Sequence, residues 1–152
     1  MKKMFAILFA LVALLLLPQQ ANAYSEHYSS SVCYPASSSA TWSKSWSGAT
    51  INGSFQAVMC PINNNTYSDI YGMYARISGS GTSCMAYMYA VSYNLEEMYT
   101  DYIYTTATVS AGSYTSIYLW DFSNLETGQA AVMFYAYSNC SALTIHGIDV
   151  LY

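Results

Sequence analysis

Residues 84–93 read CMAYMYAVSY, and this stretch decides the fold class. Every second residue from Cys84 to Ala90 is small or apolar, and larger residues such as Tyr87 and Tyr89 stand between them. A period of two is the period of a β-strand, because successive side chains point to opposite faces. Both faces are apolar or aromatic, so the stretch predicts a strand that is covered on both sides or that presents an open row of tyrosines.

Segments of similar composition continue along the chain, separated by clusters of Ser, Gly and Asn. They are residues 49–62, 70–78, 100–109, 114–122, 130–140 and 143–152. None shows the 3.6-residue period of an amphipathic helix. We therefore predict an all-β protein, an antiparallel β-sandwich of the jelly-roll or immunoglobulin-like kind with seven to eight short strands. Strand order does not follow from these patterns.

The two ends of this region give more detailed expectations. Trp42 and Trp46 lie in a Ser-rich opening and are expected to pack against other residues. In the closing segment, simple alternation gives two faces. One face would hold Leu143, Ile145 and Leu151, and the other His146, Ile148, Val150 and Tyr152.

The first 23 residues have the three parts of a secretion signal. Lys2 and Lys3 form a positive start, residues 4–17 form an uncharged apolar run, and Ala21-Asn22-Ala23 supplies the small residues of a cleavage site. The run is shorter than the roughly 20 residues that cross a bilayer. We expect residues 1–23 to be a cleavable signal peptide and residues 24–152 to be one domain. It would be secreted or periplasmic, with no stable membrane insertion after cleavage.

Cleavage would change the charge of the protein. The whole chain has a net charge of −4, and loss of Lys2 and Lys3 leaves two basic and eight acidic residues, hence −6. Binding to nucleic acid depends on Lys and Arg that release counterions from phosphates. Two cations, Lys44 and Arg76, cannot build a basic surface of that kind, so we expect no nucleic-acid partner.

All four cysteines follow the signal, and thiols oxidise in an exported protein. Two disulfides are therefore expected, in one of three pairings. We favour Cys33–Cys60 and Cys84–Cys140, because the first joins the N-terminal segment to an early strand and the second lies on strands with inward-facing neighbours. No C-x-x-C pair is present, so a zinc site is disfavoured.

The order of several short motifs resembles a family of small exported bacterial proteins that has no assigned function. The shared elements are Cys33-x-Pro35, Trp46, Gly48, Asn52, Cys60-Pro61-Ile62 and the closing segment IHGIDV at residues 145–150. That family also carries a third Cys on a mid-chain strand and a fourth on the penultimate strand. The resemblance implies a β-sandwich with two disulfides, and it supplies no catalytic residues.

Candidates for catalysis are few. A triad of a Ser with His146 and Asp149 can be written, but no G-x-S-x-G motif precedes a helix, and His27 lies close to the expected cleavage site. We interpret His146 as a surface residue. A glycosidase needs two facing carboxylates, and no pattern pairs the available acids. Those acids are Glu96, Glu97, Asp101 and Asp121.

A metal or other cofactor is not expected. The best calcium candidate is the loop of residues 63–69, NNNTYSD, in which Asn63, Asn65 and Asp69 carry oxygen ligands. One carboxylate among neutral amides gives weak charge complementarity, and the EF-hand pattern is absent. We interpret the loop as an ordinary polar turn.

Binding roles need fewer specific residues than catalysis. Tyr87, Tyr89 and Tyr93 lie on one side of a predicted strand, and Tyr102 and Tyr104 repeat this on the next segment. Such rows are suited to stacking on apolar sugar faces, although they also occur in cross-strand packing. We expect a non-catalytic domain that binds carbohydrate or a surface polymer. The alternatives are a self-associating protein of the cell surface or matrix and, as a minor one, a hydrolase.

Overall fold

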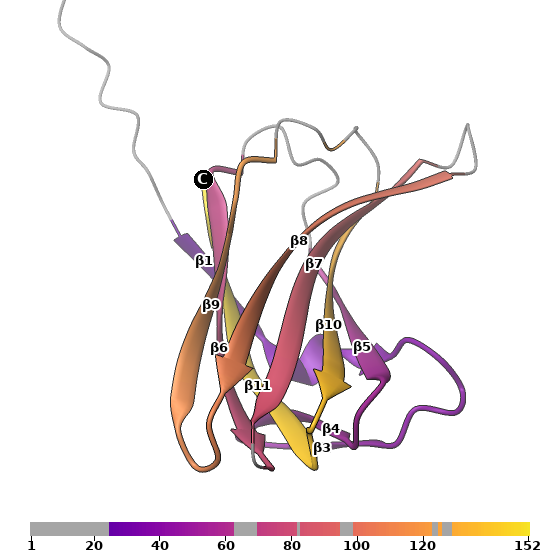
Figure 1. Cartoon of the computed structure of the whole chain (residues 1–152). Helices are drawn as coiled ribbons and strands as arrows, with labels where there is room; N and C mark the ends of the chain where they lie inside the picture. The colour runs from indigo at the N-terminus through magenta and orange to yellow at the C-terminus, as the bar shows by residue number, and fades with distance from the viewer. Residues whose placement is uncertain (1–24, 63–69, 82, 95–98, 123–124, 126–128) are drawn as a thin grey trace, which may run out of the picture.

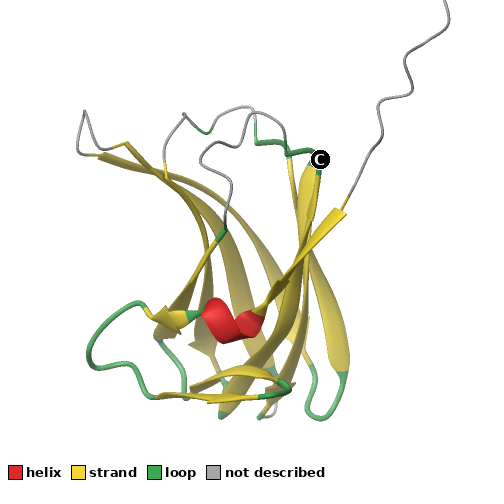
Figure 2. Ribbon diagram, turned by 180° about the vertical axis from the view of Figure 1, so that it is seen from behind, coloured by secondary structure: helices red, strands yellow, loops and turns green. Residues whose placement is uncertain are grey.

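Strands account for most of the chain in the computed structural model, which describes residues 25–62, 70–81, 83–94, 99–122, 125 and 129–152 (Figure 1). The strands are β1 (Ser25–Ser29), β2 (Tyr34–Pro35), β3 (Trp42–Ser45), β4 (Gly48–Asn52), β5 (Gln56–Pro61), β6 (Gly72–Ser80), β7 (Cys84–Asn94), β8 (Tyr99–Val109), β9 (Tyr114–Trp120), β10 (Gln129–Ser138) and β11 (Ala142–Leu151). A 3₁₀ turn, η1 (Ser30–Val32), follows β1 and is drawn in red in Figure 2, which shows the molecule from the side opposite to Figure 1.

These strands form two antiparallel sheets that face each other. Sheet A has the order β3-β4-β11-β6-β9, with β1 also paired to β11, and sheet B has the order β2-β5-β10-β7-β8. Figure 1 shows β9, β6 and β11 in one layer and β8, β7, β10 and β5 in the other. The prediction of an all-β antiparallel sandwich with two disulfides is therefore confirmed.

The core lies between the two sheets. Sheet B contributes Met88 and Phe134, and sheet A contributes Met73, Ile77 and Ile145, all fully buried. Each of these residues belongs to a strand that alternates between core and outer face, as a period of two requires. Burying such side chains is the main favourable contribution to folding.

The number of strands differs from the prediction. The described residues contain eleven strands rather than seven or eight, and β7 and β8 are each 11 residues long rather than short. The additional strands are β1 to β3, in residues 25–45. This region is rich in Ser, and most of β1 and β3 is exposed. Its strands are held by pairing with β11, β4 and β5, which composition does not reveal.

A β-bulge changes the alternation of β11. Its pairing with β6 shifts between Ile145 and Gly147, so that His146 is an extra residue in the ladder. As a result Ile145 and Ile148 both point into the core, together with Leu143 and Val150. The predicted placement of Ile148 and Val150 on the opposite face is wrong, because simple alternation does not allow for an inserted residue.

Both favoured disulfides are present. Cys33 follows η1 and joins Cys60 on β5, and Cys84 at the start of β7 joins Cys140 just after β10. All four cysteine side chains are buried. Because β7 and β10 are neighbours in sheet B, the second disulfide holds these two strands together at one end.

The two N-terminal tryptophans behave differently from each other. Trp42 is partly buried and packs against the core, as expected. Trp46 is fully exposed, so the expectation that it packs is wrong. It lies in the tight connection between β3 and β4, where no other element covers it.

No helix in the described residues is long and apolar enough to cross a membrane. The proposed signal peptide, residues 1–23, lies outside the described part of the chain.

Candidate ligand-binding surface

The outer face of sheet B carries most of the tyrosines that were singled out from the sequence. In β7, Ala86, Met88 and Ala90 are fully buried, whereas Tyr87 and Tyr89 lie on the opposite, outward side. These two tyrosines are half-buried, and no second sheet covers them. The strand thus presents an open row of tyrosines, which is one of the two alternatives that its composition allowed.

Antiparallel pairing extends this row across the sheet. Tyr89 stands opposite Met133 of β10 on one side and Tyr104 of β8 on the other. Met133 stands opposite Met59 of β5, and Met59 opposite Tyr34 of β2. One line of aromatic and thioether side chains therefore crosses all five strands. Since aligned residues share a face, the register of the strands builds this surface.

Ring contacts join the tyrosines of three strands. Tyr87 and Tyr89 stack with ring centroids 5.8 Å apart and an interplanar angle of 16°. Tyr104 lies 5.8 Å from Tyr87 and 5.5 Å from Tyr89, and Tyr102 lies 5.8 Å from Tyr89. On the other flank, Tyr137 of β10 lies 5.4 Å from Tyr87. These spacings are typical of favourable aromatic pairs.

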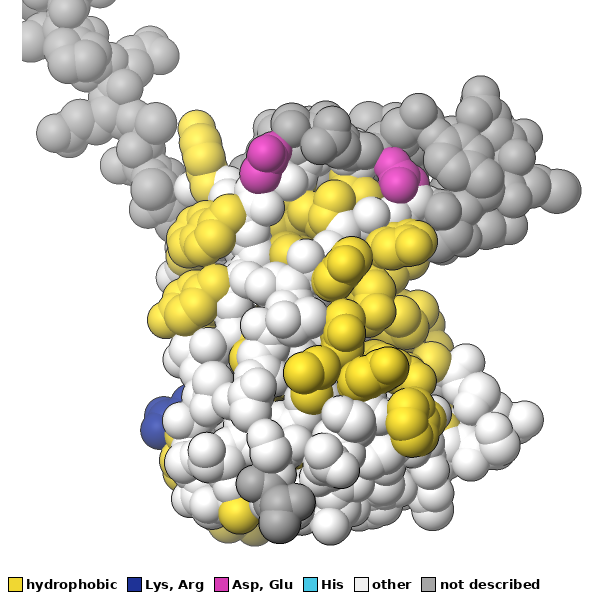
Figure 3. All heavy atoms as spheres, viewed as in Figure 1, with side chains coloured by type: hydrophobic (Ala, Val, Ile, Leu, Met, Phe, Trp, Pro, Cys, Tyr) yellow, Lys and Arg dark blue, Asp and Glu magenta, His cyan; other side chains and the backbone are white. Residues whose placement is uncertain are grey.

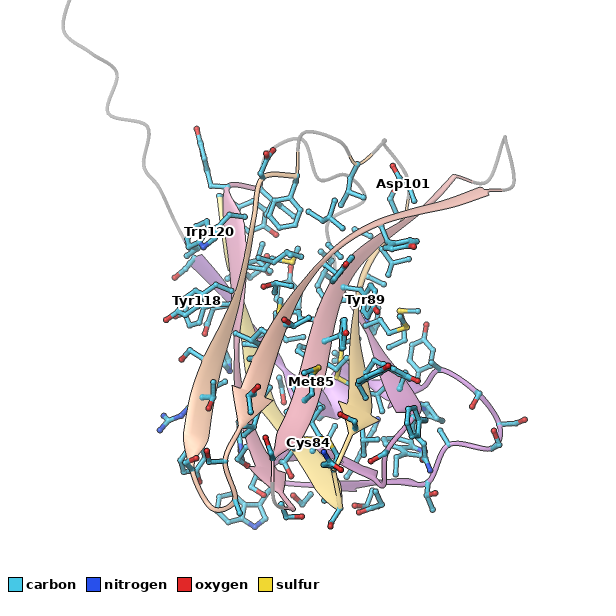
Figure 4. All side chains as sticks on the ribbon, viewed as in Figure 1. Cys84, Met85, Tyr89, Asp101, Tyr118 and Trp120 are labelled. Atoms are coloured by element: carbon cyan, nitrogen blue, oxygen red, sulfur yellow. A yellow bond between two sulfur atoms is a disulfide. The ribbon has the colours of Figure 1, made fainter. Side chains whose placement is uncertain are left out.

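We call this surface the tyrosine platform. Its members are Phe55, Tyr87, Tyr89, Tyr102, Tyr104, Tyr135 and Tyr137. Figure 3 shows hydrophobic side chains gathered over the region where Figure 1 places β7, β8 and β10, and Figure 4 places Tyr89 and Met85 on its front. The rings fix each other in place, so the platform is largely preformed.

Phe55 extends the platform from the turn before β5. Its φ of 62° is in the left-handed region, which is costly for a residue with a bulky side chain. Phe55 is 65% exposed, and its ring centroid lies 5.6 Å from that of Tyr137 in an edge-to-face arrangement. An exposed aromatic residue in a strained backbone conformation is a feature of ligand-binding surfaces.

The platform is electrically neutral. Within the described part of sheet B, the outward-facing residues of the five strands include no charged side chain. Burial raises the pKa of Tyr89, and the nearby Tyr87, Tyr102 and Tyr104 raise it further. The Tyr89 hydroxyl therefore stays protonated at neutral pH. The surface offers ring faces and hydroxyl groups rather than charge.

Four of the five tyrosines named from the sequence come together here. Tyr87, Tyr89, Tyr102 and Tyr104 form one network of ring contacts, whereas the side chain of Tyr93 lies outside the described part of the structure. The outer rings, Tyr102 and Tyr104, are 56% and 57% exposed on the edge strand β8.

Other platform members were missed by sequence reasoning. Tyr135 and Tyr137 alternate with buried residues in β10, and that alternation is visible in the segment AAVMFYAYS. Their position beside Tyr87 follows only from strand order. Phe55 carries no sequence signal for its role, because its projection depends on a turn conformation.

The triad that could be written from sequence does not form. Asp149 Oδ1 lies 2.8 Å from Nδ1 of His27, not beside His146. His146 instead has its Nε2 atom 2.8 Å from the Ser78 hydroxyl and its Nδ1 atom 2.8 Å from the Ser47 carbonyl oxygen. His146 is half-buried and bonded on both nitrogens, so its interpretation as a simple surface residue is incomplete.

The remaining candidates concern acids and metal ligands. Glu96, Glu97 and the loop of residues 63–69, with Asn63, Asn65 and Asp69, lie outside the described residues. Asp101 accepts a hydrogen bond from the backbone of Tyr102. Asp121 has a φ of 64° in the exposed segment after β9. Among described residues, no group of three or more His, Cys, Asp or Glu side chains is placed to hold a metal ion.

Comparison with known proteins matches the fold but not the sequence. No protein-family model matches the chain, and no curated protein is similar to it in sequence. Solved structures of carbohydrate-binding modules share its fold at low sequence identity. At such identities the likeness concerns the fold alone.

Three of these structures illustrate the match. A Clostridium thermocellum endo-1,4-β-D-xylanase 10B with family 22 binding and family 10 hydrolase modules, complexed with xylohexaose, gives a TM-score of 0.68 at 10% identity over 84% of this chain. This chain spans only 28% of that xylanase. The family 22 xylan-binding domain of Paenibacillus barcinonensis Xyn10C gives 0.61 at 7% identity, covering 83% of this chain and 92% of that one. A family 11 module from C. thermocellum, bound to a mixed-linked tetrasaccharide, gives 0.54 at 10% identity, covering 88% and 91%.

Proposed function

We propose that this chain is an exported, non-catalytic binding domain whose tyrosine platform binds a neutral polysaccharide. The observation that carries the proposal is the platform itself, a continuous and uncharged aromatic surface on the outer face of one sheet. A pyranose ring has an apolar face of C–H groups that can stack on an aromatic ring. Tyrosine adds a hydroxyl that can bond to the hydroxyls of the sugar.

The size of the surface favours a polymer over a single sugar. The line from Tyr34 through Tyr89 to Tyr104 crosses five strands, and neighbouring strands are about 4.8 Å apart. Several consecutive sugar rings can therefore lie on the platform together. Contiguous exposed apolar surfaces of this kind commonly mark interaction sites.

The setting supports the same proposal. Two disulfides and a signal-like N-terminus fit a protein that works outside the cytoplasm. The structures with the same fold include modules described as xylan-binding or as bound to a β-1,3-1,4-mixed-linked tetrasaccharide. The hydrolase alternative loses its most explicit residue set, because Asp149 is engaged with His27 and not with His146.

Direct binding measurements test the proposal. Xylohexaose and a β-1,3-1,4-mixed-linked tetrasaccharide would be titrated by calorimetry into the oxidised protein. We expect the double variant Tyr102→Ala/Tyr104→Ala to bind at least about tenfold more weakly, since it removes two aromatic contacts that together are worth over about 1 kcal/mol. Both rings lie on an edge strand and are largely exposed, so their removal leaves the core intact.

A matched control uses another exposed tyrosine. Tyr71, 72% exposed, lies just before β6 of sheet A, and Tyr71→Ala should bind like the wild type. Absence of binding by the wild type to either oligosaccharide and to insoluble glycans would disprove the proposal. Light scattering over a wide concentration range distinguishes glycan binding from self-association. If the protein forms oligomers through the platform, the measured molar mass should fall to that of the monomer in the double variant.

A further inference from the structure

A groove lies on the outer face of sheet A, on the other sheet from the tyrosine platform. It is an open groove of about 520 Å³ between β1, β6, β9 and β11. Its lining includes His27, Tyr74, Arg76, Tyr114, His146 and Asp149. Figure 4 shows Tyr118 and Trp120 projecting from the nearby strand β9, on the opposite flank from Tyr89. The groove is therefore separate from the tyrosine platform, and its volume falls in the range of small-molecule sites.

Basic side chains are concentrated in this groove. Residues 25–152 contain only four Lys, Arg and His side chains, and three of them line it: His27, Arg76 and His146. The tyrosine platform, in contrast, has none. Residues 25–152 carry eight acidic side chains and only two of Lys and Arg, so the presence of Arg76 marks the groove as a place where an anion can bind.

Arg76 is held in position while its guanidinium stays available. The guanidinium carbon lies 4.5 Å from the centre of the Tyr114 ring, as in a cation–π contact. Across the described residues the ion pair between His27 and Asp149 is the only one, so no described carboxylate pairs with Arg76. A guanidinium fixed by stacking keeps a planar fork of N–H donors that fits a carboxylate.

The acidic residue in the groove is already engaged. Asp149 Oδ1 lies 2.8 Å from His27 Nδ1, and interaction with the Asp149 carboxylate raises the pKa of Tyr74. His27 is seated over Gly147, where any Cβ would come within 2.6 Å of its ring. Asp149 is thus engaged with His27 at the edge of the groove, and Arg76 is the Lys or Arg side chain that lines it.

An aromatic shelf leads toward Arg76. Tyr118 and Trp120 stack with centroids 6.3 Å apart and an interplanar angle of 6°, and about half of each side chain is exposed. Trp120 lies flat on the sheet because its partner in β6 is Gly72, where a Cβ would stand 2.1 Å from the ring. Strand register places Tyr118 opposite Tyr74, one outward-facing row from Arg76. Tyr118 is therefore the ring nearer to Arg76, and Trp120 continues the shelf one row further from the groove.

We propose that this groove is a second saccharide site, which binds an acidic glycan with its sugar ring on Tyr118 and Trp120 and its uronate carboxylate on Arg76. The shelf explains recognition of a sugar ring, and Arg76 explains preference for a carboxylate. The platform on sheet B has the first feature without the second. The two sites therefore select different sugars, and the domain can contact two polymers at once.

The test uses trigalacturonate as the probe, titrated into the oxidised full domain with xylohexaose present at saturation. We expect binding that weakens as NaCl rises from about 0.05 M to about 0.5 M, because Arg76 is exposed and its charge is screened. Arg76→Gln should weaken binding at least about tenfold, through loss of the bidentate cation. Lys44→Gln removes a lysine on β3 of sheet A, outside the groove, and should change binding by less than about twofold.

The shelf is tested separately. Trp120→Ala should weaken trigalacturonate binding at least about tenfold, and Trp120→Phe should recover part of it by restoring a ring. Failure of the wild type to bind, equal losses in the Arg76 and Lys44 variants, or displacement by xylohexaose would each overturn the proposal. The proposal would also be overturned if inorganic phosphate competed with trigalacturonate as effectively as trigalacturonate itself and Trp120→Ala had no effect. That result would indicate a simple anion site. The wild type and the variants are also titrated without xylohexaose, so trigalacturonate binding and the effects of the substitutions are measured whether or not xylohexaose binds the platform.

Discussion

Removing the Cys84–Cys140 disulfide should lower the free energy of unfolding by about 4.2 kcal/mol. In the chain-entropy model the effect grows with the length of the closed loop, and the two cysteines are separated by 56 residues. The Cys33–Cys60 bridge closes only 27 residues, so its loss should cost about 3.5 kcal/mol. The variants are Cys84→Ala/Cys140→Ala and Cys33→Ala/Cys60→Ala.

Urea unfolding followed by tryptophan fluorescence measures both losses against the wild type. The slope of the free energy with urea should increase when a bridge is removed, because the unfolded chain then exposes more surface. The Cys84–Cys140 bridge joins β7 to β10 on the buried side of sheet B, so glycan binding should persist wherever the Cys84→Ala/Cys140→Ala variant remains folded. A loss below about 1 kcal/mol for the longer loop would refute the reasoning, since it would mean that the bridge does not restrict the unfolded chain.

Two further predictions concern single aromatic residues. Tyr28 is buried, and burial together with hydrogen bonds to Tyr152 and Glu26 raises its pKa far above the ordinary value of 10.0. In the unfolded chain the Tyr28 hydroxyl ionises near its ordinary pKa, whereas in the folded protein it stays neutral. The contribution of Tyr28 to the free energy of unfolding is therefore complete below the ordinary pKa and declines as the pH rises above it. Tyr28→Phe should therefore flatten the fall in unfolding free energy above about pH 10, with Tyr71→Phe as an exposed control; identical slopes would contradict the assignment. Phe55→Gly relieves the steric cost of a left-handed φ of 62° and removes the ring contact with Tyr137, two effects of about 1 kcal/mol each and of opposite sign. Its unfolding free energy should stay within about 1 kcal/mol of the wild type while xylohexaose binding weakens; unchanged affinity would show that Phe55 is not part of the binding surface.

Most of the fold could be predicted from local patterns. Alternation in residues 84–93 gave a strand with the correct inward set, Ala86, Met88 and Ala90, and the cysteine placement led to both disulfides. Local patterns failed where pairing with a distant strand decides the structure. Strand β1 pairs with β11 and β2 with β5, and the bulge at His146 arises where β11 pairs with β6; each pair joins segments that are far apart in sequence.

The binding surface was predictable only in part. Tyr87, Tyr89, Tyr102 and Tyr104 were found because they share a face with neighbours two residues away. Tyr135 and Tyr137 join them only because β10 pairs with β7. No sequence pattern indicated the groove on sheet A, because its residues come from four strands, β1, β6, β9 and β11.

By itself the sequence determined the all-β class, the disulfide pairing that we favoured and the alternation that makes one face of each main strand apolar. These properties follow from neighbours within a few residues and from the chemistry of cysteine. Only the tertiary structure decided which strands are adjacent, and therefore that an uncharged tyrosine surface lies on sheet B while Arg76, both histidines and the Tyr118–Trp120 shelf lie on sheet A. Strand order is set by the packing of the whole core, so no local pattern contains it.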